Sequence, residues 1–95
     1  MFVQIIQVFP LISRDYTDRQ GNRQQFLSKG LLVETGHGTL FVEGVQEIAT
    51  QIERLQLKEK DCCLLQIGSV ARNYKSSSGD ERYSNEVTIK RITIV

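Results

Sequence analysis

Residues 36–55 read GHGTLFVEGVQEIATQIERL, and within this stretch a strand pattern changes to a helical one. Gly36-His37-Gly38 supplies flexible backbone for a short hairpin, and residues 39–43 resume as its second strand. Beyond that strand the apolar residues recur at intervals of three and four, at Val45, Ile48, Ala49, Ile52 and Leu55. The spacing predicts one amphipathic helix of about three turns.

Segments with strand composition lie on both sides of this stretch. Residues 1–12 predict a strand, in which Pro10 marks a bend or the end because proline cannot donate a ladder hydrogen bond. Residues 13–25 are polar and rich in turn formers, so we expect a loop there, followed by a second strand over residues 26–34. After the helix, residues 62–74 and 83–95 are extended, and a shift in apolar phase between Ile89 and Ile92 predicts a bulge near Lys90.

The resulting order is three strands, one helix and two strands, which disfavours a parallel doubly wound sheet. One helix cannot cover a flat antiparallel sheet of this size, whereas a sheet curled into a barrel buries its own inner face. We therefore expect an all-β fold with small α content. It would be a five-stranded Greek-key barrel of the oligonucleotide/oligosaccharide-binding (OB) type, with the helix between strands three and four. Residues 1–95 would form a single OB-fold domain; the alternative is an open α+β sandwich with the helix laid across the sheet.

Composition narrows the class of protein. With 40% hydrophobic and 24% charged residues, the chain has the make-up of a folded domain rather than a disordered one. Its apolar runs are too short to span a membrane and no signal-like leader is evident, so we expect a cytoplasmic protein without a membrane partner.

Cys62 and Cys63 are adjacent and point to opposite faces of an extended strand, which predicts reduced thiols. A single histidine offers no metal-ligand spacing, so we expect no metal and no other cofactor.

Catalysis has little support in these residues. Gly36-His37-Gly38 is too short for a phosphate loop, and His37 lacks a serine, cysteine or carboxylate at nucleophile–base spacing. Asp80 and Glu81 are neighbouring carboxylates, but a flexible loop tip cannot hold them in a fixed geometry. We therefore expect a protein that is not an enzyme.

Charge is segregated along the chain although the formal net charge is only +1. Residues 43–61, around the predicted helix, are mainly acidic, whereas the two predicted loops that flank an OB binding face carry basic and aromatic residues. Exposed rings in such loops suit unpaired bases, and neighbouring cations suit phosphates. Two simpler interpretations stay open: loops are polar in any protein, and Tyr74 and Tyr83 could form a cross-strand pair. The candidate nucleic-acid-binding residues are Arg14, Tyr16, Arg19, Arg23, Lys29, Arg72, Tyr74, Lys75, Arg82 and Tyr83.

Two segments carry a resemblance to a known family: GVQEIA at residues 44–49, and RNYKSSSGDERYSNEV at residues 72–87. They resemble bacterial single-stranded DNA-binding proteins, and the likeness is best over residues 44–95. The resemblance implies that Tyr74 takes the place of a stacking aromatic residue and that Arg72, Lys75 and Arg82 form its basic flank. It also implies association into a homodimer or homotetramer.

The sequence departs from that family in its first half. The positions where the family stacks aromatic residues on strand three fall at His37 and Glu43, and the long hairpin between strands two and three is reduced to residues 35–39. The family's acidic-tipped tail has no counterpart in these residues. Short tail-less relatives, such as primosomal, phage or plasmid OB proteins, also match this pattern.

These observations predict non-enzymatic binding of single-stranded DNA through a basic, tyrosine-bearing cleft, in DNA replication, recombination or repair, with RNA as a further candidate. The alternative is an OB-fold adaptor subunit that binds protein and has no direct contact with nucleic acid. A sugar-binding OB domain ranks third, for lack of tryptophan and of Asn or Asp clusters around an aromatic residue.

Overall fold

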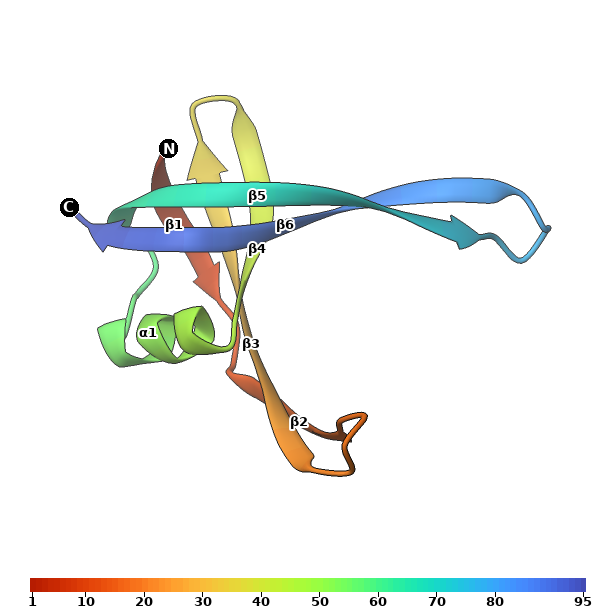
Figure 1. Cartoon of the computed structure of the whole chain (residues 1–95). Coiled ribbons are helices and arrows are strands. Elements are labelled where there is room, and N and C mark those ends of the chain that lie inside the picture. The colour runs from red at the N-terminus through yellow and green to blue at the C-terminus, as the bar shows by residue number, and fades with distance from the viewer.

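The computed structural model describes residues 1–95 and is built almost entirely from strands, with a single helix (Figure 1). The elements in chain order are β1 (Phe2–Val8), β2 (Ile12–Thr17), β3 (Arg23–Thr35), β4 (Gly38–Val45), α1 (Glu47–Leu55), β5 (Cys62–Lys75) and β6 (Glu81–Ile94).

The sheet closes on itself. Its strand order is β1-β5-β6-β4-β3-β2, and β1 also pairs with β3, so all strands except β2 form a ring. The pairings are antiparallel except that of β4 with β6, which is parallel and registered at one pair, Glu43 with Thr88. With α1 between β4 and β5, this confirms the predicted all-β OB barrel and excludes the open sandwich.

The prediction of a loop over residues 13–25 is wrong. Residues 12–17 form β2, which pairs with the first part of β3 from Ile12 opposite Ser28 to Thr17 opposite Arg23. The turn is held by Asp18, whose Oδ1 accepts hydrogen bonds from the backbone N–H groups of Asn22 at 2.8 Å and Gln20 at 2.9 Å. These bonds, above all that from Asn22, hold the pKa of the Asp18 carboxyl below its usual range.

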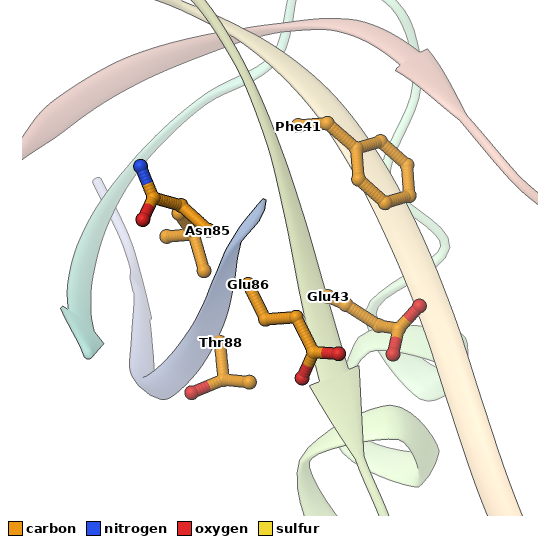
Figure 2. Close-up of a pocket in the computed structure, with 6 residues that line it drawn as sticks. Phe41, Glu43, Asn85, Glu86 and Thr88 are labelled. Carbon is orange, nitrogen blue, oxygen red and sulfur yellow. The ribbon is translucent and has the colours of Figure 1, made fainter. Parts of the chain in front are cut away.

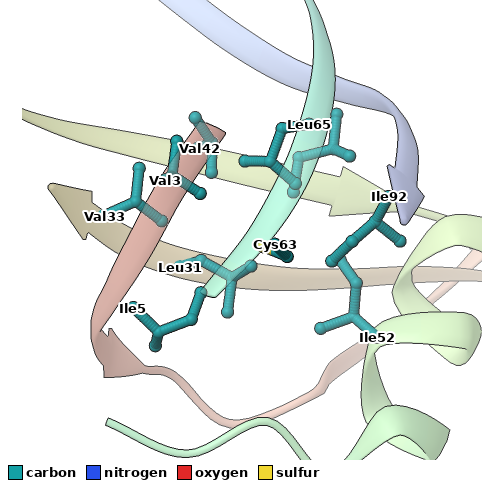
Figure 3. Packing of buried hydrophobic residues seen from close by; sticks show 10 residues of the cluster. Val3, Ile5, Leu31, Val33, Val42, Ile52, Cys63, Leu65 and Ile92 are labelled. Carbon is teal, nitrogen blue, oxygen red and sulfur yellow. The ribbon is translucent and has the colours of Figure 1, made fainter. Parts of the chain in front are cut away.

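The barrel interior is filled by aliphatic side chains from every strand of the ring (Figure 3). Helix α1 contributes Ile52, which is fully buried, as the helical spacing predicts. The helix lies close to β4 because Gly44 has no side chain there: a Cβ at this position would be 2.6 Å from Ile52 Cδ1. The buried cluster consists of Val3, Ile5, Leu31, Val33, Val42, Ile52, Cys63, Leu65, Ile89 and Ile92.

The adjacent cysteines are both free thiols, and only Cys63 is fully buried. Burial raises the pKa of the Cys63 thiol, with a smaller contribution from the negative charge that Cys62 carries when ionised. No helix in the protein is long and apolar enough to pass through a lipid bilayer.

Two hairpins project beyond the barrel (Figure 1). We call residues 12–28, formed by β2 and the start of β3, the first arm, and residues 69–87, formed by the distal halves of β5 and β6, the second arm. The predicted bulge is confirmed: Gln66 pairs with Arg91 and Ile67 with Ile89, which leaves Lys90 as the extra residue. The radius of gyration is 15.3 Å, larger than the roughly 13 Å of a compact domain of this length, because the arms extend away from the core.

Candidate nucleic-acid interface

One face of the sheet runs from the first arm, across the barrel, to the second arm. Residues that pair across strands share a face, and so do alternate residues along a strand. On this basis the outer face passes along β3 and β4 and then crosses from Glu43 to its partner Thr88 on β6. No register shift interrupts these stretches, so the following residues all lie on the outer face: Arg14, Tyr16, Phe26, Gly30, Leu32, Phe41, Glu43, Thr88, Glu86, Arg82, Tyr74 and Arg72.

On the second arm, the structure places Tyr74 beside two arginines. Tyr74 lies opposite Arg82, and Arg72 is two residues away on the same face. The Tyr74 side chain is half exposed, so its ring is accessible to a ligand. Arg72 Nε donates to Glu86 Oε2 at 3.2 Å, and both side chains are largely exposed.

Tyr83 and Lys75 occupy the opposite face of the second arm. Tyr83 lies opposite Asn73, and Lys75 lies opposite Glu81. The alternative interpretation, a cross-strand pair of Tyr74 with Tyr83, is therefore excluded, because the register offsets the two rings by one residue. Tyr83 is 68% exposed and remains free for other contacts.

The first arm repeats the combination of ring and guanidinium. Arg14 lies opposite Phe26, and Tyr16 lies two residues from Arg14 on the same face. Together with Asp15 these residues line a shallow depression, and the two rings are exposed. Arg23 is on the other face, opposite Thr17, and Arg19 lies in the turn at the tip.

The position of Lys29 differs from the prediction, which placed it in the interface. Its side chain is buried, and its ammonium group lies 2.6 Å from Glu53 Oε2 on α1 and donates to the backbone carbonyl of Phe9 at 2.9 Å. The lysine therefore ties β3 to the helix and to the segment after β1. Because its charge is already paired below the surface, we exclude Lys29 from the interface.

Phe41 is an exposed aromatic residue that sequence reasoning missed. Its ring packs against Gly30, where a Cβ would lie 2.6 Å from ring atom Cζ, and it forms a T-shaped contact with Phe9, with ring centroids 5.5 Å apart and an interplanar angle of 78°. The side chain is nevertheless 49% exposed, on the β3–β4 surface that OB domains use for binding. The alternation of side chains along β4 would have predicted its exposure, because the neighbouring Val42 faces the core.

A small notch opens beside Phe41, where β4 meets β6 (Figure 2). It has a volume of about 270 Å³ and is lined by Phe41, Glu43, Asn85, Glu86, Val87 and Thr88. Figure 2 shows the side chains of Glu43, Glu86 and Phe41 among those that line the notch. No pocket is lined by residues of both arms; two basic, aromatic arms flank an acidic notch.

The closed barrel with a helix at one end defines an OB-fold domain. Among solved structures, the chain is similar to the second OB-fold domain of replication protein A from Methanococcus maripaludis, determined by solution NMR. The likeness covers 99% of this chain and 79% of that chain, with a TM-score of 0.58 and 15% sequence identity. At this identity the comparison shows the fold, and it does not single out the bacterial single-stranded DNA-binding family.

No protein-family model matches the chain, and no curated protein matches it.

Proposed function

We propose that this protein binds single-stranded DNA without catalysis, through the outer face that joins the two arms. The observation that carries the proposal is that Tyr74 shares one face with Arg82, opposite it, and with Arg72, two residues along the strand, and that its side chain is half exposed. A ring with cations as neighbours offers a stacking surface for a base and charge for the adjacent phosphates.

The rest of the face supports the same ligand. Arg14, Tyr16 and Phe26 provide a second group of rings and charge on the first arm, and Phe41 presents a ring on the barrel between the arms. A strand of unpaired bases is flexible enough to follow such a path. Duplex DNA fits less well, because its bases are stacked on each other and cannot reach the rings.

We extend the proposal to the biological setting. A role in DNA replication, recombination or repair agrees with the structural neighbour, which is named as part of a replication protein. We propose a cytoplasmic location and the absence of an enzymatic reaction. RNA offers the same unpaired bases and phosphates, so an RNA strand belongs in the experiment.

Titration of a labelled mixed-sequence oligonucleotide tests the proposal. Three basic residues on the outer face or at the tip of the first arm have no ion-pair partner, namely Arg14, Arg19 and Arg82. If each meets one phosphate, log K falls with log salt at a slope of about −2.1, so a fourfold rise in salt weakens binding by roughly 20-fold. Duplex of the same sequence should bind more weakly.

Arg54→Ala is the matched control, because Arg54 lies on α1, away from the proposed face, and its removal should leave the slope unchanged. Absence of binding at low salt, or binding that ignores salt, would reject the proposal.

A different surface is suited to protein–protein contact. Near the chain termini, Phe2, Leu57, Ile94 and Val95 line an apolar depression, and Phe2, Ile94 and Val95 are exposed. Exposed apolar surface of this kind is typical of protein interfaces. We propose that a second copy of this chain covers it, giving the predicted homo-oligomer.

Light scattering after size-exclusion chromatography tests this interface. A Phe2→Ser variant that becomes monomeric while still binding the oligonucleotide would separate the two surfaces. A wild-type protein that oligomerises and binds no oligonucleotide would favour the adaptor function.

A further inference from the structure

We infer that the notch at the β4–β6 junction selects the base of the bound strand, taking bases that carry an exocyclic amino group in preference to thymine or uracil. The inference rests on the proposed function and adds a sequence preference to it. The residues concerned are Phe41, Glu43 and Glu86, none of which the sequence pattern had marked as binding residues.

The acidic lining of the notch determines which part of a nucleotide can enter it. Glu43 and Glu86 place two carboxylates there, and no basic side chain lines it. Phosphates are therefore repelled from the notch and attracted to the arginines of the arms on either side. A nucleotide at the notch is thus oriented with its phosphates toward the arms and its base toward the barrel.

Phe41 provides the surface that would hold a base. Phe41 is half exposed and its ring contacts Gly30 and packs at a steep angle against Phe9, which gives this stacking surface a defined orientation. The notch beside it is of the order of a small-ligand pocket, at about 270 Å³. A base stacked on this ring presents its edge to the residues that line the notch.

The carboxylates of the notch determine which base edge is accepted. An ionised carboxylate can only accept hydrogen bonds, and Glu43 has no hydrogen-bond or ion-pair partner within the protein. Cytosine offers its N4 amino group, adenine its N6 amino group, and guanine also carries an amino group. Thymine and uracil place carbonyl oxygens at the corresponding position, and these oxygens are repelled by a carboxylate.

Oligo-dC and oligo-dU of equal length provide the sharpest comparison, because their bases differ in the amino group and the adjacent ring nitrogen and neither carries a methyl group. We expect oligo-dC to bind at least about fivefold more tightly, since a single specific contact to a base edge discriminates by about that factor or more. In Glu43→Gln the ratio should fall toward one, because the amide can both donate and accept.

Glu34→Gln is the matched control. Glu34 is exposed on the same outer face, at the far end of β3 and outside the notch, so its substitution removes the same charge and should leave the ratio unchanged. Glu86→Gln provides a second test of the notch: it should also lower the ratio, while strengthening binding of both oligonucleotides because Arg72 is released for phosphate.

The outcomes separate the two proposals. Equal binding of oligo-dC and oligo-dU by the wild-type protein overturns the base preference and leaves the proposed function standing. A preference that persists in both Glu43→Gln and Glu86→Gln also overturns the assignment to the notch. If neither oligonucleotide binds at low salt, the proposed function itself fails.

Discussion

Replacing Lys29 by methionine tests whether this lysine is part of the fold or part of the interface. Its ammonium group bridges Glu53 Oε2 at 2.6 Å and the Phe9 carbonyl at 2.9 Å, beneath the surface. Methionine keeps the apolar stem and removes the charge, so that Lys29→Met breaks both contacts without opening a large cavity. We expect a protein that is less stable and binds DNA with an unchanged salt slope.

The size of the stability loss follows from the burial of the two partners. Removing one member of a fully buried ion pair costs about 3–5 kcal/mol, but the Glu53 side chain is 51% exposed and its carboxylate can return to water. The Phe9 carbonyl loses a charged donor, a contact that contributes about 1.5–3 kcal/mol. Together these give an expected loss of about 1–3 kcal/mol in the free energy of unfolding.

Urea unfolding followed by circular dichroism measures this loss, and oligonucleotide titration at several salt concentrations measures the slope. Lys58→Met is the control, because Lys58 is exposed and its substitution should change stability by no more than about 0.5 kcal/mol. If Lys29→Met left stability unchanged and made the salt slope shallower by about 0.7, Lys29 would contact a phosphate and its assignment to the fold would be wrong.

Three further predictions concern the rings and the thiols. Tyr74→Ala should weaken oligonucleotide binding by about 1–3 kcal/mol without changing the salt slope, whereas Arg82→Ala should make the slope shallower by about 0.7; the reverse pattern would exchange their roles. Gly30→Ala should displace the Phe41 ring, since the new Cβ would lie 2.6 Å from it, and a variant that binds as tightly as wild type would show that the ring does not stack on bases. A thiol reagent at mildly alkaline pH should spare Cys63 in the native protein, because burial raises its pKa and the thiolate forms only at higher pH. Equal labelling of the two cysteines before unfolding would contradict that protection.

The barrel could be predicted from the sequence because each of its strands and the helix buries one face in the core, which gives the sequence a periodic pattern of apolar residues. The helical spacing up to Leu55 and the phase shift at Lys90 are both consequences of that core, and both predictions are confirmed. The strand β2 could not be predicted in the same way. Every residue of β2 is exposed, so the strand carries no alternation of apolar and polar side chains.

The candidate interface was predictable only in part, because it depends on pairing between distant segments. The shared face of Arg72 and Tyr74 follows from alternation alone, but the position of Tyr83 depends on the register of β5 with β6. The contact of Lys29 with Glu53 joins residues 24 positions apart, and local sequence contains no sign of it. Phe41 does not depend on such distant pairing, because the alternation of side chains along β4 is enough to place it on the outside of the barrel.

The single registered pair between β4 and β6 has a consequence for motion. Every other pair of neighbouring strands in the ring is held together by at least three residue pairs. Separating β4 from β6 therefore breaks the fewest hydrogen bonds. Amide hydrogens along this junction should exchange with solvent through local opening, well before those of the β5–β6 ladder. A ligand lying across the junction would slow that exchange, so its arrival could be followed at the backbone of β4 and β6 even though the core stays closed.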